Sequence, residues 1–246
     1  MIDEEIAVKL TPEERERYGR DGFLLRPAVF SEAEVARMQE EADYVLELLV
    51  NSALSSGRPS GRIDVGKGPS GDVHVRKIQP VNDVSLYFSQ VSNDVRLLGP
   101  LADLMGSEPR LMEEKLNYKQ PVPNWPAQFA VRDREDYFAP HNDWAFYSAQ
   151  GYPQDIVSSM IVMDDCTVDN GPLVLWPGSH REYLPHITTA AGDLTVTPGL
   201  IDEAAGQDLL APAGSVVFFH ALLVHSSRPN ATDRPRRLMI YSHYPG

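Results

Sequence analysis

The spacing of apolar residues changes near residue 107, and this change constrains the fold more than any other feature of the chain. Before it, FSEAEVARMQEEADYVLELL repeats apolar residues three or four positions apart, as in a helix with one face on a core. After it come short runs rich in β-branched and aromatic residues: AQFAVRD, IVSSMIVMDD, PLVLWP, GSVVFFH and RRLMIYSHY. Helices followed by many short strands predict a single α+β domain, mainly β, with a barrel or jelly-roll core and flanking helices.

Two capping boxes indicate where the N-terminal helices begin. In LTPEERERYGRDG, Thr11 is placed to cap a helix whose third residue, Glu14, completes the box. Ser31 and Glu34 repeat this pattern at the start of the second helix. The predicted organisation is one domain over 1–246, with a helical part over about 8–106, including a helix near 92–106, and a β-rich part over about 107–246.

Two stretches outside these elements carry local signals. Residues 51–72, NSALSSGRPSGRIDVGKGPSGD, are dominated by Gly, Ser and Pro, which predicts a loop. A loop of this length is more often a lid or binding loop than a spacer, with simple disorder as the alternative. We expect it to form a lid, and HVRKIQP (74–80) to add polar contacts to the same wall. Asn170-Gly171, between two β runs, predicts a hairpin.

Composition and charge narrow the class of partner. The formal net charge of −13 argues against nucleic acid and gives no support for docking on anionic lipid. The start, MIDEEIAVKL, lacks the features of a signal peptide, and no apolar run approaches the length of about 20 residues that a membrane span needs. Cys166 is the single cysteine, so an internal disulfide and a thiolate zinc cluster are excluded. We expect a cytoplasmic monomer or homodimer that binds a small molecule.

The strongest chemical signal begins in APHNDWAFY. His141 and Asp143 lie two residues apart, so on an extended segment both side chains point to one face. Alone, the pair is more consistent with a surface polar patch than with a metal site. His225 follows a second apolar β stretch, and two histidines with one carboxylate form the facial triad that binds non-haem Fe(II). Arg236 and Arg237 open the next strand, and an arginine is the natural partner for the distal carboxylate of a 2-oxo acid.

Several segments together resemble the phytanoyl-CoA dioxygenase-like (PhyH) branch of the Fe(II)/2-oxoglutarate-dependent oxygenases. They are LTPEERERYGRDGFLLRPAVFSEAEVARM, KLNYKQP, PHNDW, DDCTVDNGPLVLWPGSH and HSSRPNATDRPRR. The resemblance implies a double-stranded β-helix of the jelly-roll or cupin type. It also implies Fe(II), 2-oxoglutarate as co-substrate and O2. The sequence departs from the family pattern at Asn142, where glutamine is usual, and at Ser226, where glycine is usual.

The resemblance also implies roles for individual residues. His141, Asp143 and His225 match the metal triad, and Arg236 matches the arginine that binds 2-oxoglutarate, although Arg237 stays open as the alternative. Ser227, Asn117 and Tyr147 match positions beside the co-substrate. The expected substrate pocket is formed by His74, Arg76, Phe138, Trp144 and Phe146. His180 is expected to order a loop near the site, whereas His186, His220 and His243 match no functional position.

The resemblance implies hydroxylation of an unactivated C–H bond in a small metabolite or an intermediate of secondary metabolism, with release of succinate and CO2. Desaturation, epimerisation and cyclisation remain alternatives on the same scaffold. Halogenation is disfavoured, because halogenating relatives replace the aspartate that Asp143 supplies here. Two readings from other classes are a non-oxidative cupin-type metalloenzyme and a non-catalytic binding module. The first leaves the arginine without a task, and the second does not explain an intact set of ligands.

Overall fold

A computed structural model describes residues 8–68, 70–122, 125, 129, 131, 136–190 and 192–246. The predicted strand AQFAVRD lies largely outside the described residues. The larger sheet is antiparallel, in the order β1-β11-β6-β13-β4-β3-β2. Its strands are β1 (Phe23–Arg26), β2 (Ile63–Lys67), β3 (Val73–Ile78), β4 (Pro109–Pro121), β6 (Val157–Val162), β11 (Val216–His220) and β13 (Leu238–Pro245).

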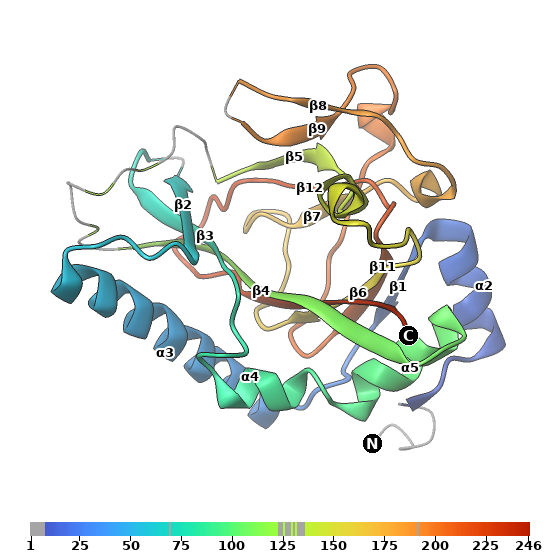
Figure 1. Cartoon of the computed structure of the whole chain (residues 1–246), viewed down its shortest axis with the longest axis horizontal. Helices are drawn as coiled ribbons and strands as arrows, with labels where there is room; N and C mark the ends of the chain where they lie inside the picture. The colour runs from blue at the N-terminus through green and yellow to red at the C-terminus, as the bar shows by residue number, and fades with distance from the viewer. Residues whose placement is uncertain are drawn as a thin grey trace.

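A smaller sheet faces the larger one, in the order β10-β7-β12-β5. Its strands are β5 (Phe138–His141), β7 (Leu173–Leu175), β10 (Gln207–Asp208) and β12 (His225–Ser227). A separate hairpin of β8 (His186–Thr188) and β9 (Leu194–Val196) lies beyond β5, at the top of Figure 1. Two opposed antiparallel sheets with flanking helices form a jelly-roll core, so the predicted fold class is confirmed.

The helices are α2 (Pro12–Asp21), α3 (Glu32–Ser56), α4 (Leu86–Val91), α5 (Val95–Met105) and the short α6 (Trp144–Tyr147). Both predicted capping boxes are present: Thr11 with Glu14, and Ser31 with Glu34. In Figure 1, α3, α4 and α5 cover one face of the larger sheet. The face of α3 that meets the sheet includes the apolar residues whose spacing predicted this helix: Val35, Met38, Ala42, Val45 and Leu49.

Strand alternation divides the apolar core into two layers. Along β13, Met239 and Tyr241 face the helices, whereas Leu238 and Ile240 face the smaller sheet. Successive strand residues point to opposite faces, so a sheet covered on both sides becomes continuously apolar. Because one face is closed by helices, a ligand site is left to the space between the two sheets.

Two predictions about connecting segments are wrong. Residues 51–72 are not one loop, because α3 continues to Ser56 and Ile63–Lys67 forms β2, paired with β3. The part predicted to be helical also contains β1, β2 and β3. Asn170-Gly171 does not close a hairpin, because β6 pairs in the larger sheet and β7 in the smaller one. Gly171, with a φ of 78°, instead turns the chain from one sheet to the other.

Among the described residues, no helix is both long and apolar enough to cross a membrane.

The buried His243 on β13 predicts a pH dependence of stability. Burial lowers the pKa of this imidazole from an ordinary 6.5 to about 4. The unfolded chain therefore binds a proton at this residue below pH 6.5, whereas the folded protein does so only near pH 4. The contribution of the neutral, buried His243 to stability is complete above pH 6.5 and is lost as the pH falls from 6.5 to about 4.

We expect His243→Gln to reduce the slope of unfolding free energy against pH between 6.5 and 4 by up to about 1.4 kcal/mol per pH unit. Urea titrations at a series of pH values measure this slope. Above pH 7, the variant and the wild-type protein should have parallel profiles. An unchanged slope between pH 6.5 and 4 would show that His243 does not cause the effect.

Candidate metal centre and co-substrate cavity

Two histidines meet because β5 and β12 are neighbours in the smaller sheet. The pairing places His225 directly opposite His141, and their ring centroids lie 4.4 Å apart. On its other side, β12 pairs with β7, where His225 lies opposite Leu175. The position of His225 is therefore fixed from both sides by backbone pairing.

Asp143 reaches the histidines through a turn and not along an extended strand. β5 ends at His141, and Asp143 has helical dihedral angles (φ −64°, ψ −32°) as the residue that precedes α6. Asn142 stabilises this turn, because its side-chain oxygen accepts from the N–H of Ala145. The expectation that His141 and Asp143 share a face of one strand is therefore wrong in geometry, although the two side chains do converge.

The three side chains form a compact donor set. The Nε2 atoms of His141 and His225 each lie 3.8 Å from Oδ1 of Asp143. One donor atom from each residue can be chosen so that all lie within 4.8 Å of one another. A gap of 3.8 Å accommodates an ion with bonds of about 2 Å to both atoms. Two imidazoles and one carboxylate on one side of a cavity are the donor set of non-haem Fe(II).

The backbone fixes the tautomers of both histidines. Nδ1 of His141 lies 2.7 Å from the carbonyl oxygen of Ala139, and Nδ1 of His225 lies 3.0 Å from that of Leu223. A carbonyl oxygen only accepts, so both Nδ1 atoms carry a proton, which leaves Nε2 as the nitrogen that faces a metal in each ring. Burial lowers the pKa of His141 to about 3, and the neighbouring His225 acts in the same direction. His141 is therefore neutral at pH 7, as a metal ligand must be.

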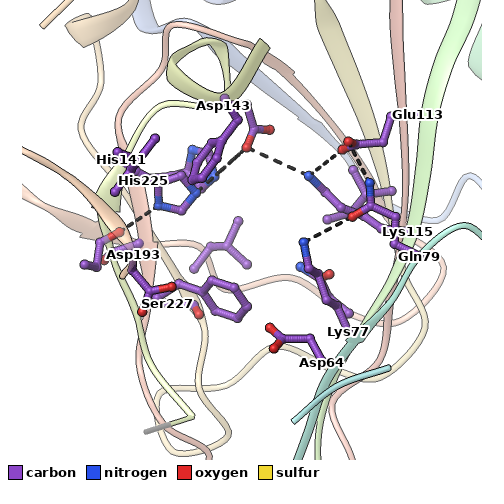
Figure 2. A pocket seen from close by; sticks show the side chains of 18 of the residues that line it. Asp64, Lys77, Gln79, Glu113, Lys115, His141, Asp143, Asp193, His225 and Ser227 are labelled. Atoms are coloured by element: carbon purple, nitrogen blue, oxygen red, sulfur yellow. Dashed lines mark hydrogen bonds and ion pairs between the residues drawn. The ribbon is translucent and has the colours of Figure 1, made fainter. Parts of the chain in front are cut away.

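Asp143 faces a cation that the sequence did not predict. Burial raises the pKa of the Asp143 carboxyl, but nearby positive charge, chiefly that of Lys115, lowers it by more, so the net shift is downward. Nζ of Lys115 lies 3.9 Å from Oδ1 of Asp143 and 3.0 Å from Oε1 of Glu113. Figure 2 shows Lys115 and Glu113 across the cavity from the histidines. Asp143 is therefore ionised, and its Oδ2 has no hydrogen-bond partner within the described part of the chain.

These residues line a cavity of about 660 Å³ between the two sheets. The predicted residues that line it are Asn117, Phe138, His141, Asp143, Phe146, Tyr147, His225, Ser227 and Arg236. Part of the predicted wall is also present, because residues 61–65 and Lys77, Gln79 and Pro80 line the same space. The predicted lid segment therefore contributes to the cavity as a strand and its preceding turn.

Three residues predicted in the substrate pocket do not line the cavity: His74, Arg76 and Trp144. His74 is buried beside Asp72, with its Nε2 3.0 Å from that carboxylate. Arg76 donates to the backbone oxygen of Tyr137, and its guanidinium stacks 4.1 Å over the ring of Phe138. Arg76 thus supports a cavity residue from behind.

Trp144 packs outside the cavity because the turn after His141 directs it there. Its ring lies 5.0 Å from the ring of Tyr183, edge to face. Phe146, two residues later, lies on the cavity side, 5.6 Å from the ring of His141. Trp144 was predicted to form a wall of the pocket because it directly follows His141 and Asp143. Trp144 and Phe146 both lie on α6, but their side chains point in different directions.

One end of the cavity holds polar atoms that lack partners. Arg236 is buried, and its Nε and Nη1 have no hydrogen-bond partner among the described residues. Oδ1 of Asn117 and Oγ of Ser227 are also buried and have no hydrogen-bond partner among the described residues. Burial lowers the pKa of the Arg236 guanidinium, because the described surroundings do not fully compensate for the lost water. An unpaired buried cation indicates that an anionic ligand binds at this end.

Arg237, which with Arg236 directly precedes β13, is engaged with two carboxylates. Its guanidinium pairs with Asp164 at 2.8 Å and with Asp43 at 2.8 Å. It does not line the cavity. Of the two arginines that the sequence left open, the geometry therefore favours Arg236 as the ligand-binding residue.

The other end of the cavity carries a hydrogen-bond network that the sequence did not predict. The hydroxyl of Tyr147 donates to Oε1 of Glu113 at 2.8 Å, and Gln79 donates to Oε2 at 2.7 Å. Tyr147, predicted beside the co-substrate, therefore lies at the end opposite Arg236. A signal was present, because Glu113, Lys115 and Asn117 alternate along β4 with buried neighbours such as Leu116.

The donor set predicts metal binding that can be measured without substrate. We expect Asp143→Ala to weaken Mn(II) binding at least about ten-fold, because the one carboxylate ligand is lost and two neutral imidazoles remain. Calorimetric titration with Mn(II) as a probe for Fe(II) measures this. His180→Ala is the matched control, since His180 lies outside the donor set. Equal weakening in both variants would contradict the site.

The comparisons with known proteins agree with this geometry. The sequence profile of the phytanoyl-CoA dioxygenase (PhyH) family matches residues 18–238. An ectoine dioxygenase from Halomonas elongata is 27% identical over 253 residues, covering 95% of this chain and 69% of that protein.

Among solved structures, EctD from S. alaskensis with bound Fe has a TM-score of 0.70 at 25% identity, covering 96% of this chain and 77% of EctD. The same protein with 2-oxoglutarate and 5-hydroxyectoine gives 0.71 at 23% identity, with 96% and 76% covered. SnoK, a non-heme alpha ketoglutarate dependent carbocyclase from nogalamycin biosynthesis, gives 0.70 at 20%, with 97% and 85% covered. The match of the family profile to most of the chain shows that this protein belongs to the phytanoyl-CoA dioxygenase (PhyH) family.

Proposed function

We propose that this protein is an Fe(II)- and 2-oxoglutarate-dependent dioxygenase that hydroxylates an unactivated C–H bond of a small metabolite. The observation that carries the proposal is Arg236, a buried cation whose Nε and Nη1 have no hydrogen-bond partner among the described residues. It shares one cavity with His141, Asp143 and His225. A cupin-type metalloenzyme or a plain binding module would leave this charge buried without purpose. Ectoine dioxygenase from Halomonas elongata is a relative with the same class of activity in its name.

Each group in the cavity has a proposed task. His141, Asp143 and His225 would hold Fe(II), and Arg236 with Ser227 would bind the distal carboxylate of 2-oxoglutarate. When bound there, iron with 2-oxoglutarate and O2 supplies oxidative decarboxylation to succinate and CO2 together with oxidation of a substrate C–H bond.

The chain itself orients these groups and excludes water. The apolar floor of the cavity, formed by Leu173, Phe219 and Ile240, limits solvent around the triad. The Asn117 carboxamide, with its unpaired Oδ1, lies on the wall between the triad and the Arg236 end. We infer that Asn117 helps to position the co-substrate. The hydroxyl of Tyr147 donates to Glu113, so we do not assign Tyr147 a contact with the co-substrate.

Other outcomes remain second candidates on the same scaffold. SnoK is named a carbocyclase, so cyclisation is one of these candidates. Desaturation and epimerisation are the other two. Asp143 completes the triad and so disfavours halogenation, and hydroxylation is retained as the default outcome. The cytoplasmic location, a role in secondary metabolism and a monomeric or homodimeric state stay predictions from the sequence.

The two adjacent arginines test the proposal. We expect Arg236→Ala to raise the 2-oxoglutarate concentration for half-maximal succinate formation about 30-fold or more, since loss of a buried charge partner costs at least 2 kcal/mol. Arg236→Lys should recover part of the loss, because it keeps the charge but not the planar pair of donors.

Arg237→Ala is the matched comparison, since it removes a neighbouring arginine that pairs with Asp164 and Asp43. It should lower stability and leave the 2-oxoglutarate requirement within about three-fold of the wild-type value. A large increase for Arg237→Ala with none for Arg236→Ala would reverse the assignment. No succinate from the wild-type protein with Fe(II), 2-oxoglutarate and air would contradict the proposed function.

A further inference from the structure

The β8–β9 hairpin lies against the segment that carries the first two metal ligands. Figure 1 shows the hairpin directly beyond β5. Thr195 on β9 donates from its hydroxyl to the carbonyl oxygen of Pro140 at 2.9 Å. On β8, Nε2 of His186 accepts from the backbone N–H of Asn142 at 3.1 Å. The hairpin therefore holds the backbone on both sides of His141.

The base of the hairpin is in turn anchored to the strand of the third ligand. His186 lies opposite Val196 in the β8–β9 register. Val196 is buried in an apolar cluster with Val174 and Val224, and Val224 directly precedes His225. Because the hairpin packs on this cluster and bonds to the β5 segment, it connects the backbones that carry all three ligands.

The hydrogen bonds fix His186 in one neutral form. Its Nδ1 lies 2.8 Å from the carbonyl oxygen of Leu184, which only accepts, so Nδ1 carries a proton. The N–H of Asn142 only donates, so Nε2 is the acceptor. Burial lowers the pKa of His186, which favours this form. The ring also stacks on Tyr183 at 5.7 Å, and Tyr183 meets Trp144 edge to face.

The N–H that His186 accepts from belongs to the residue between two ligands. Asn142 is fully buried, so its N–H would be left without a partner if the imidazole were lost. A buried N–H without an acceptor is costly, and the backbone then shifts to reach water or another acceptor. Asn142 begins the turn that brings Asp143 beside His141, so such a shift would move the carboxylate away from the imidazoles.

We propose that His186 is a positioning residue of the metal centre: its Nε2 holds the N–H of Asn142 and thereby fixes the turn in which Asp143 meets His141 and His225. The imidazole acts from outside the cavity, and residues 192–194 at the tip of the same hairpin line the cavity. The inference rests on the proposed function, because it assigns an outer partner to the metal site of that function.

Calorimetric titration of the metal-free protein with Mn(II), as a probe for Fe(II), tests this role without turnover. His186→Phe keeps a ring against Tyr183 but has no acceptor, and we expect it to bind Mn(II) about ten-fold or more weakly than the wild-type protein. His186→Gln loses the ring but offers Oε1 as an acceptor, so it should stay within about three-fold of the wild-type affinity. His186→Leu, which also lacks an acceptor, replaces His186→Phe if that variant does not fold.

Ile187→Ala is the matched control, because Ile187 is the next residue of β8 and its side chain is exposed. It should bind Mn(II) as the wild-type protein does. Binding of Mn(II) to the wild-type protein is measured first, and its failure would contradict the proposed function. If the wild-type protein binds Mn(II), the role of His186 is overturned by wild-type affinity in His186→Phe. Equal weakening in His186→Phe and in either His186→Gln or Ile187→Ala would also overturn it, because a residue that only stabilises the hairpin gives that result.

Discussion

The pairing of β5 with β12 is the constraint on which the rest of the site depends. It joins two segments far apart in the sequence and sets His141 opposite His225. A slip of one residue would turn either imidazole to the other face of the sheet. β7 holds β12 from its other side, and the backbone carbonyls of Ala139 and Leu223 then fix both tautomers. The smaller sheet thus supplies two imidazoles oriented so that Nε2 of each faces the metal centre.

The larger sheet supplies the charges that face this centre. Along β4, Glu113, Lys115 and Asn117 project into the cavity, while their neighbours pack on the helices. Most buried charges here are paired, as Glu113 is with Lys115 and Arg237 with Asp164. Arg236 differs, because its Nε and Nη1 have no hydrogen-bond partner among the described residues. A buried cation without an acceptor costs stability, so Arg236 indicates where a ligand completes the structure.

The sequence predicted what depends on local chemistry and periodicity. Capping boxes placed the starts of α2 and α3, and short runs rich in β-branched and aromatic residues identified β6, β11 and β13. The order of His141, Asp143, His225 and Arg236 pointed to the site before any geometry was known. The sequence did not predict β2, because a Gly- and Ser-rich segment becomes a strand only through its pairing with β3.

Other gaps have the same physical origin. The choice between Arg236 and Arg237 depends on Asp164 and Asp43, which come from distant elements. The placement of Trp144 outside the cavity depends on the turn that Asn142 stabilises. Contacts between distant segments decide each of these points, and periodicity within one segment carries no information about them.

The central claim is that the triad and Arg236 together hold one metal ion and one 2-oxoglutarate molecule. Anaerobic titration of the protein with Fe(II) and 2-oxoglutarate, followed by visible absorption, tests it most directly. A weak charge-transfer band of a chelated 2-oxo acid should appear only when both are present, and should need far more 2-oxoglutarate in Arg236→Ala. A protein that binds Fe(II) tightly but gives no such band at saturating 2-oxoglutarate would contradict the account.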